Sequence, residues 1–156
     1  MIGFVLVAVA PFQFWKSFRN KHRPVHRAMG YVAVTCLTLL ATSGVAVAIV
    51  YPFAGIAGII PNVVWMSAIL YAAGMAVARI RKRDMLGHET WMTRAIAMTL
   101  GITFASLYIP ILTGVLHVPS RPALAISFWL GVGECLLVGE LWLRRPGRPQ
   151  PRRPTA

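Results

Sequence analysis

Five side chains that could do acid–base or ligand chemistry lie within or beside long apolar stretches of this sequence: His26, His88, Arg94, Glu134 and Glu140. A charge inside a membrane-spanning helix costs at least ~2.5 kcal/mol and normally faces a partner or a water-filled cavity. Arg94 therefore needs an acceptor, and we predict a buried ion pair between Arg94 and either Glu134 or Glu140. Such a pair either ties two helices together or forms the floor of a ligand or proton site.

The histidines suggest a second kind of site. Two histidines from different helices at one membrane level are the ligands of a bis-imidazole b-type haem, so His26 and His88 could hold haem b or contact a quinone, with Arg94 stabilising negative charge. The competing interpretation places both imidazoles at the membrane margin, where they cap helices or contact lipid headgroups. His22 and His26 have metal-binding spacing, but Pro24 is expected to start the helix after His22, so no metal site is predicted.

No catalytic set is recognisable in the sequence. It contains no nucleotide-binding loop, nucleophile elbow or zinc-protease helix. Cys36 and Cys135 lie in apolar stretches without a CxxC motif, and each is expected to be a small buried hydrophobe rather than half of a disulfide. The sequence therefore favours a non-enzymatic protein.

Five stretches are long and apolar enough, or nearly so, to cross a membrane, which takes roughly 20 residues. We therefore predict an all-α integral membrane protein, a bundle of about five transmembrane helices over residues 1–145. The first stretch is short, contains Pro11 and begins at the first Met, so upstream residues could be missing from the reading frame. The predicted spans are residues 2–18, 28–50, 61–78, 91–116 and 123–143.

The charges predict the orientation of the chain. Sixteen Lys and Arg residues, against four acids, gather in three short clusters between the apolar stretches, a distribution that argues against nucleic acid despite the net charge of +12. Basic loops favour the cytoplasm, which predicts a multi-pass protein of the bacterial inner membrane with its N-terminus outside and its C-terminus in the cytoplasm. The Pro- and Arg-rich tail, residues 146–156, is expected to be disordered and to lie against anionic lipid. Predicted headgroup contacts are Lys16, Arg19, Arg27, Arg81, Lys82 and Arg83.

Small residues spaced i, i+4 mark faces on which membrane helices approach closely. The last two predicted spans carry such stripes, which do not distinguish packing within the chain from packing against another subunit. Pro110 is expected to kink the fourth span. Several aromatic residues lie near helix ends, as an aromatic belt requires, among Trp15, Tyr31, Tyr51, Trp65, Trp91, Tyr108 and Trp142. The predicted packing residues are Ala97, Gly101, Ser127, Gly131, Cys135 and Gly139.

Two segments, PFQFWKSFRNKHRPVHRAMGYV and LGHETWMTRAIAMT, resemble an uncharacterised bacterial family of predicted multi-helix membrane proteins, a domain of unknown function. Members have a Gln-Phe ending to one helix, a basic loop, then H-R-x-x-G, and later H-x-x-W-M-x-R. The similarity covers most of residues 11–101, and it implies a membrane fold with a shared cytoplasmic-side cluster but no activity. The matching positions are Gln13, Phe14, His26, Arg27, Gly30, His88, Trp91, Met92 and Arg94.

The sequence is compatible with three functions. The first is a non-enzymatic accessory or scaffold subunit that packs within a larger respiratory or photosynthetic membrane complex. The second is a membrane redox protein that uses His26 and His88 for haem or quinone, and the third is a small transporter or proton relay centred on Glu134. Small size, packing stripes, the basic tail and the lack of a catalytic set favour the first.

Overall fold

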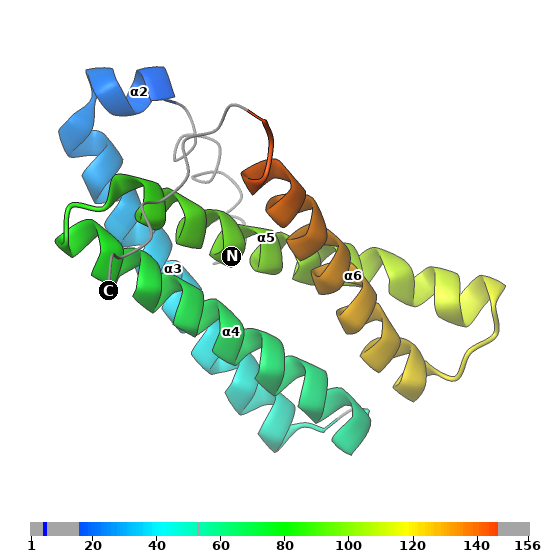
Figure 1. Ribbon diagram of the computed structural model, residues 1–156. Helices are drawn as coiled ribbons and strands as arrows, with labels where there is room; N and C mark the ends of the chain where they lie inside the picture. Colours follow the sequence, from blue (N-terminus) through cyan, green and yellow to red (C-terminus); the bar gives the residue numbers. More distant parts are fainter. Residues whose placement is uncertain (1–4, 6–15, 53, 147–156) are drawn as a thin grey trace, which may run out of the picture.

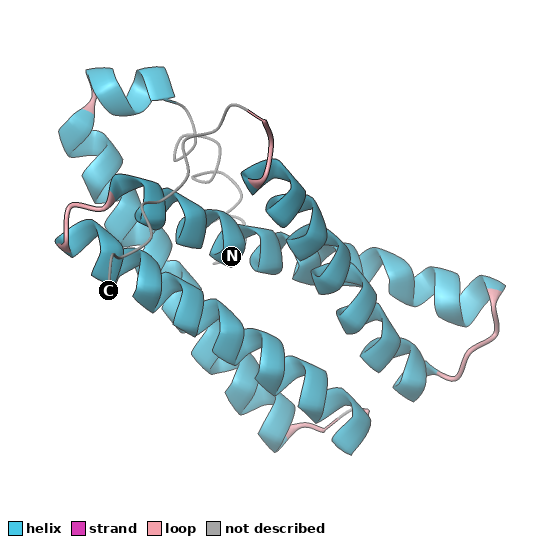
Figure 2. Ribbon diagram, viewed as in Figure 1, coloured by secondary structure: helices cyan, strands magenta, loops and turns pink. Residues whose placement is uncertain are grey.

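The computed structural model describes residue 5, residues 16–52 and residues 54–146, and this part of the chain consists of helices and short turns without β-strands (Figures 1 and 2). The predicted all-helical fold is therefore confirmed. The helices are α2 (Lys16–Lys21), α3 (Arg23–Val50), α4 (Ile56–Arg81), α5 (Met85–Pro110), the π-helical segment η1 (Ile111–Val115) and α6 (Ser120–Leu143).

Four of the described helices are long and apolar enough to cross a membrane: α3, α4, α5 continued by η1, and α6. The shortest has 24 residues, which at 1.5 Å per residue is about 36 Å, more than the ~30 Å of a hydrocarbon core. The predicted first span, residues 2–18, lies outside the described residues except for residue 5 and its last three residues, which belong to or begin α2. The predicted tail lies outside them beyond residue 146.

The helices α3 and α4 each begin five residues before the predicted position. In α3, Pro24 is the second residue of the helix, in the first turn, where its fixed φ and missing N–H are tolerated. In α4 the prediction took Pro61 as the first helical residue, which is wrong: the helix begins at Ile56 and Pro61 is buried inside it. Gly55, with φ of 60°, makes the preceding turn, because a positive φ costs glycine little.

At Pro110, where the sequence predicts a kink, the helix changes type. The α5 helix ends at this residue and the chain continues for five residues as η1, a π-helix. Proline lacks the N–H that the α-helical pattern requires, and a local π-helical turn is one way in which a helix accommodates this loss.

The four long helices alternate in direction, so that their ends gather at two levels (Figure 1). The start of α3, the α4–α5 turn and the end of α6 share one level, which we call the basic end. The turns at residues 51–52, 54–55 and 116–119 lie at the opposite end, where Arg121 is exposed in the first turn of α6. The described basic residues of the basic end are Arg23, Arg27, Arg79, Arg81, Lys82, Arg83, Arg144 and Arg145.

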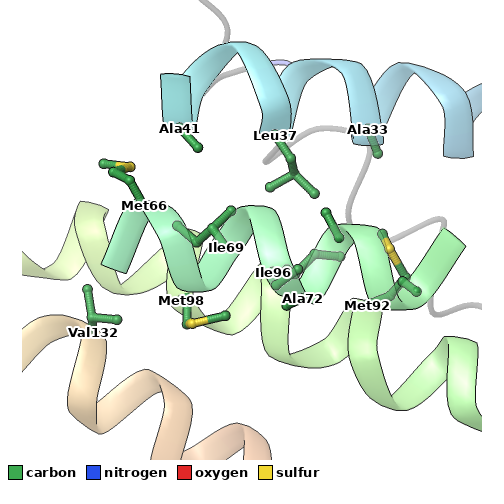
Figure 3. Packing of buried hydrophobic residues seen from close by; sticks show 13 residues of the cluster. Ala33, Leu37, Ala41, Met66, Ile69, Ala72, Met92, Ile96, Met98 and Val132 are labelled. Carbon is green, nitrogen blue, oxygen red and sulfur yellow. The ribbon is translucent and has the colours of Figure 1, made fainter. Parts of the chain in front are cut away.

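The core is formed mostly of small and flexible side chains. Leu37 of α3, Ile69 of α4 and Val132 of α6 are completely buried, and methionines of α4 and α5 fill the space around them (Figure 3). The helix α4 contacts all three other long helices, whereas α3 packs mainly on α4. The helices α5 and α6 make the most extensive contact of any described pair. Arg94 and Tyr108 of α5 and Glu134 and Glu140 of α6 lie on these two helices.

Candidate functional site

The H-x-x-W-M-x-R segment opens α5 and directs its side chains against α4. The His88 Nδ1 atom lies 2.9 Å from the carbonyl oxygen of Ala76 in α4. Because a carbonyl only accepts, Nδ1 must carry the hydrogen, which leaves Nε2 without one in the neutral ring. One turn further along, the Trp91 ring meets Tyr71 of α4 edge to face, with ring centroids 5.5 Å apart. Both contacts hold α5 to α4.

Arg94 connects the same segment to α6. Its Nε donates to Glu140 Oε1 at 2.5 Å and its second terminal nitrogen donates to Oε2 at 3.3 Å. The guanidinium also lies over the Trp91 ring, 4.7 Å from the ring centroid. A forked, charge-assisted pair of this kind is the strong form of an ion pair, and Arg suits it because its planar group can bind a carboxylate and stack on an aromatic ring at once. We call Tyr71, His88, Trp91, Arg94 and Glu140 the motif joint.

Glu134 does not take part in the motif joint. The sequence left Glu134 and Glu140 open as partners of Arg94, and the structure places Arg94 against Glu140. Glu134 lies six residues earlier on α6, about 9 Å further from the basic end, and its Oε2 accepts a hydrogen bond from the Tyr108 hydroxyl of α5. The sequence indicated only an aromatic belt role for Tyr108. The partner is 26 residues away, and no local spacing reveals such a contact.

His26 lies half-buried in the first turn of α3, at the basic end. The other proposed haem ligand, His88, uses Nδ1 to bind α4, so that Nε2 is the atom that would face a metal. Ligating histidines commonly donate their other nitrogen to a backbone carbonyl in this way. Within the described residues, no three His, Cys, Asp or Glu side chains gather closely enough to hold a metal ion.

Asp84 organises the turn between α4 and α5, a role that the sequence analysis missed. Its carboxylate accepts from the Gly87 backbone N–H at 2.8 Å and from the Arg79 guanidinium at 3.1 Å. These two donors, the Gly87 N–H above all, hold the pKa of Asp84 below its ordinary value. The available signal was an aspartate directly before a helix, which is a preferred N-cap.

The small-residue stripes of α5 and α6 meet each other within the chain. A Cβ atom added to Gly131 would lie 2.5 Å from both the carbonyl oxygen of Gly101 and the backbone nitrogen of Ala105, and one added to Gly139 would lie 3.1 Å from the Ala97 Cβ. Ser127 is completely buried on the same stripe.

The two cysteines flank these packed surfaces. The sequence predicted that both are buried, which is wrong, since Cys36 and Cys135 are each half-buried. Cys36 lies beside the α3 residues that enter the core, and Cys135 lies beside the glycine stripe of α6, where the neighbouring helix covers only part of its surface.

The predicted headgroup residues that the structure describes lie at the basic end. Arg27, Arg81, Lys82 and Arg83 are all exposed there, the last three in or next to the α4–α5 turn. Lys16 and Arg19 belong to α2, and their side chains lie outside the described residues.

A known family of membrane proteins is similar in sequence to this chain. The model of a family described as "Predicted membrane protein (DUF2306)" matches residues 1–143. The chain belongs to this family. The match covers all four of the described spans, and it confirms the resemblance drawn from the two motif segments. No curated protein and no solved structure matches the chain. As a DUF2306 protein the chain is a membrane protein with several apolar helices, and its chemistry rests on the contacts described above.

Proposed function

We propose that this chain is a non-enzymatic scaffold or accessory subunit of a larger respiratory or photosynthetic complex in the bacterial inner membrane, with its basic end in the cytoplasm. The observation that carries the proposal is that polar side chains of the H-x-x-W-M-x-R segment contact neighbouring helices of the same chain. His88 binds α4, and Arg94 binds α6. Motif residues whose polar groups bind other helices of the same chain favour a structural role, in which they hold the helices together, over a catalytic role.

The surface available to a partner is the outer side of α3. This helix has 28 residues, of which three are buried: Ala33, Leu37 and Ala41. Its large apolar side chains, such as Leu39 at 51% and Val47 at 52% exposure, are uncovered by the described residues. Packing against another subunit would cover this surface by the same van der Waals contacts that join helices within the chain.

The exposed basic residues support a second element of the proposal, which is binding of anionic lipid at the basic end. Each basic residue close to an anionic surface contributes about 1 kcal/mol of attraction. Arg81, Lys82 and Arg83 stand together at the α4–α5 turn, next to the motif joint. Lipid binding there would fix the depth and orientation of the bundle.

Gentle purification tests the scaffold role. The tagged chain, extracted in a mild detergent, should co-purify with a fixed set of membrane subunits identified by mass spectrometry. A photo-crosslinking amino acid at Val47 of α3 should form adducts with one of these subunits, whereas the same probe at Val138 of α6, which is 65% exposed, serves as the matched control. A monomer without partners, or adducts only to residues 2–18 of the same chain, would contradict the proposal.

A second candidate, binding of haem b or a quinone, is favoured by the orientation of His88. The hydrogen bond from Nδ1 to the Ala76 carbonyl leaves Nε2 as the atom that would bind the haem iron. His26 would supply the second ligand. When bound, haem would supply one-electron transfer, and Arg94 would stabilise negative charge nearby. An absorption spectrum of the purified protein should then show a Soret band that shifts with dithionite and weakens in His88→Ala, and a spectrum without that band excludes haem.

A further inference from the structure

Glu134 lies at the border between the packed face and the outward face of α6, since it is three residues after the buried Gly131. The packed stripe of this helix runs through Ser127, Gly131 and Gly139, which are buried. Glu134 is also four residues after Leu130 and three before Leu137, which are 47% and 61% exposed. Residues at these spacings share one side of a helix. The carboxyl group of Glu134 is therefore half-buried at the edge of an apolar, outward-facing surface.

The position of Glu134 along α6 is also deep. It is nine residues before Leu143 and fourteen after Ser120, or about 14 Å and 21 Å from the two ends of the helix. Both values place the carboxyl group within the hydrocarbon layer if α6 crosses the membrane. Water that could solvate a carboxylate is scarce at that depth.

The contacts of Glu134 differ in charge from those of Glu140. The described salt bridges join Arg79 with Asp84 and Arg94 with Glu140, and neither of them includes Glu134. Its hydrogen-bond donor in the described structure is the neutral hydroxyl of Tyr108. A carboxylate that faces lipid without a cation is unfavourable, and taking up a proton removes its charge.

We propose that Glu134 and Tyr108 form a hydrogen-bonded site at the edge of the lipid-facing surface of α6, in which the Glu134 carboxyl group can bind a proton. The titratable groups beside it are Tyr108 from α5 and the adjacent Cys135 thiol of α6. On α4, the Trp65 ring contacts Trp129 of α6, and neither ring titrates. Glu140, six residues away, remains a fixed charge held by Arg94. This site is independent of the proposed scaffold role.

Dicyclohexylcarbodiimide tests the site, because this lipid-soluble reagent modifies protonated carboxyl groups. The carboxyl proton moves to a carbodiimide nitrogen, a carboxyl oxygen bonds to the central carbon, and an oxygen-to-nitrogen acyl shift gives a stable N-acylurea with the mass of one added reagent. The full chain in native membranes should be modified at Glu134, with at least tenfold less adduct at Glu140. Peptide mass spectrometry locates the adduct.

Two variants make the result specific. Glu134→Gln should lose the adduct, and Tyr108→Phe should keep it, because the tyrosine donates to the carboxyl group without being the reacting atom. Equal modification of Glu134 and Glu140, or no modification of Glu134 in membranes, would overturn the proposal. Modification only after detergent extraction would also overturn it, since it would mean that a partner covers Glu134 in the membrane.

Discussion

The α5–α6 pair and the α3–α4 pair are joined in different ways. In the first pair, backbone meets backbone: a Cβ on Gly131 would lie 2.5 Å from main-chain atoms of Gly101 and Ala105. In the second pair, a Cβ on Gly44 would meet the end of the Met66 side chain, 2.9 Å from Cε. Although α5 is shorter than α3, it buries nine residues where α3 buries three. One contact is rigid and the other can adapt, because a methionine side chain has several rotatable bonds.

The largest expected effect comes from breaking the rigid contact. Gly131→Ala should lower the free energy of unfolding by about 2–3 kcal/mol, because the helices must separate to admit the methyl group. Thermal unfolding in detergent, followed with a thiol-reactive dye in a Cys36→Ser background, would report exposure of Cys135 on the same helix. Gly133→Ala, where nothing lies within 4 Å of the added Cβ, is the matched control and should be neutral or stabilising. Equal losses in both variants would contradict the close contact.

The ion pair at the motif joint should have the next largest effect. Arg94→Met leaves Glu140 without its hydrogen-bonded cation and should cost about 2 kcal/mol. The same thermal assay measures this loss. In the double variant Arg94→Met with Glu140→Leu, most of the stability should return, since the uncompensated charge is gone. A stable single variant would show that the pair does not hold α5 to α6.

A smaller, pH-dependent effect on stability is expected at the α4–α5 turn, which connects the α3–α4 pair to the α5–α6 pair. The pKa of Asp84 is lowered in the folded protein, so its contribution to stability is complete above the ordinary aspartate pKa of about 4 and is lost as the pH falls through the lowered value. The midpoint of unfolding should therefore fall as the pH is lowered below about 4. Asp84→Asn should weaken this dependence, and an unchanged pH profile in that variant would exclude Asp84 as its source.

The smallest effect should come from the adaptable contact. Gly44→Ala requires only that the terminal methyl of Met66 moves, so we expect a change within about 0.5 kcal/mol. Dye labelling of Cys36 on the same helix, in a Cys135→Ser background, measures it. If Gly44→Ala destabilises the protein as much as Gly131→Ala, the two helix pairs do not differ in the way described.

The sequence by itself determined that the chain is a helical membrane protein, because hydropathy is a local property. The i, i+4 spacing indicated Gly131 and Gly139 of the packed stripe but also Cys135, which is only half-buried. The sequence also indicated that Arg94 requires an acid. The start of α4 was misplaced, since Pro61 is a good first helical residue and equally a tolerated interior one where the preceding apolar residues continue the helix.

Tertiary structure decided the partners. Glu134 and Glu140 are six residues apart on one helix, and only the register of α5 against α6 assigns one to Tyr108 and the other to Arg94. That register depends on the close approach of Gly101 on α5 and Gly131 on α6, two residues that lie on different helices and are 30 positions apart in sequence. A single sequence shows which residues belong to each helix. It does not show which residues of two helices face each other, because that depends on how the helices pack.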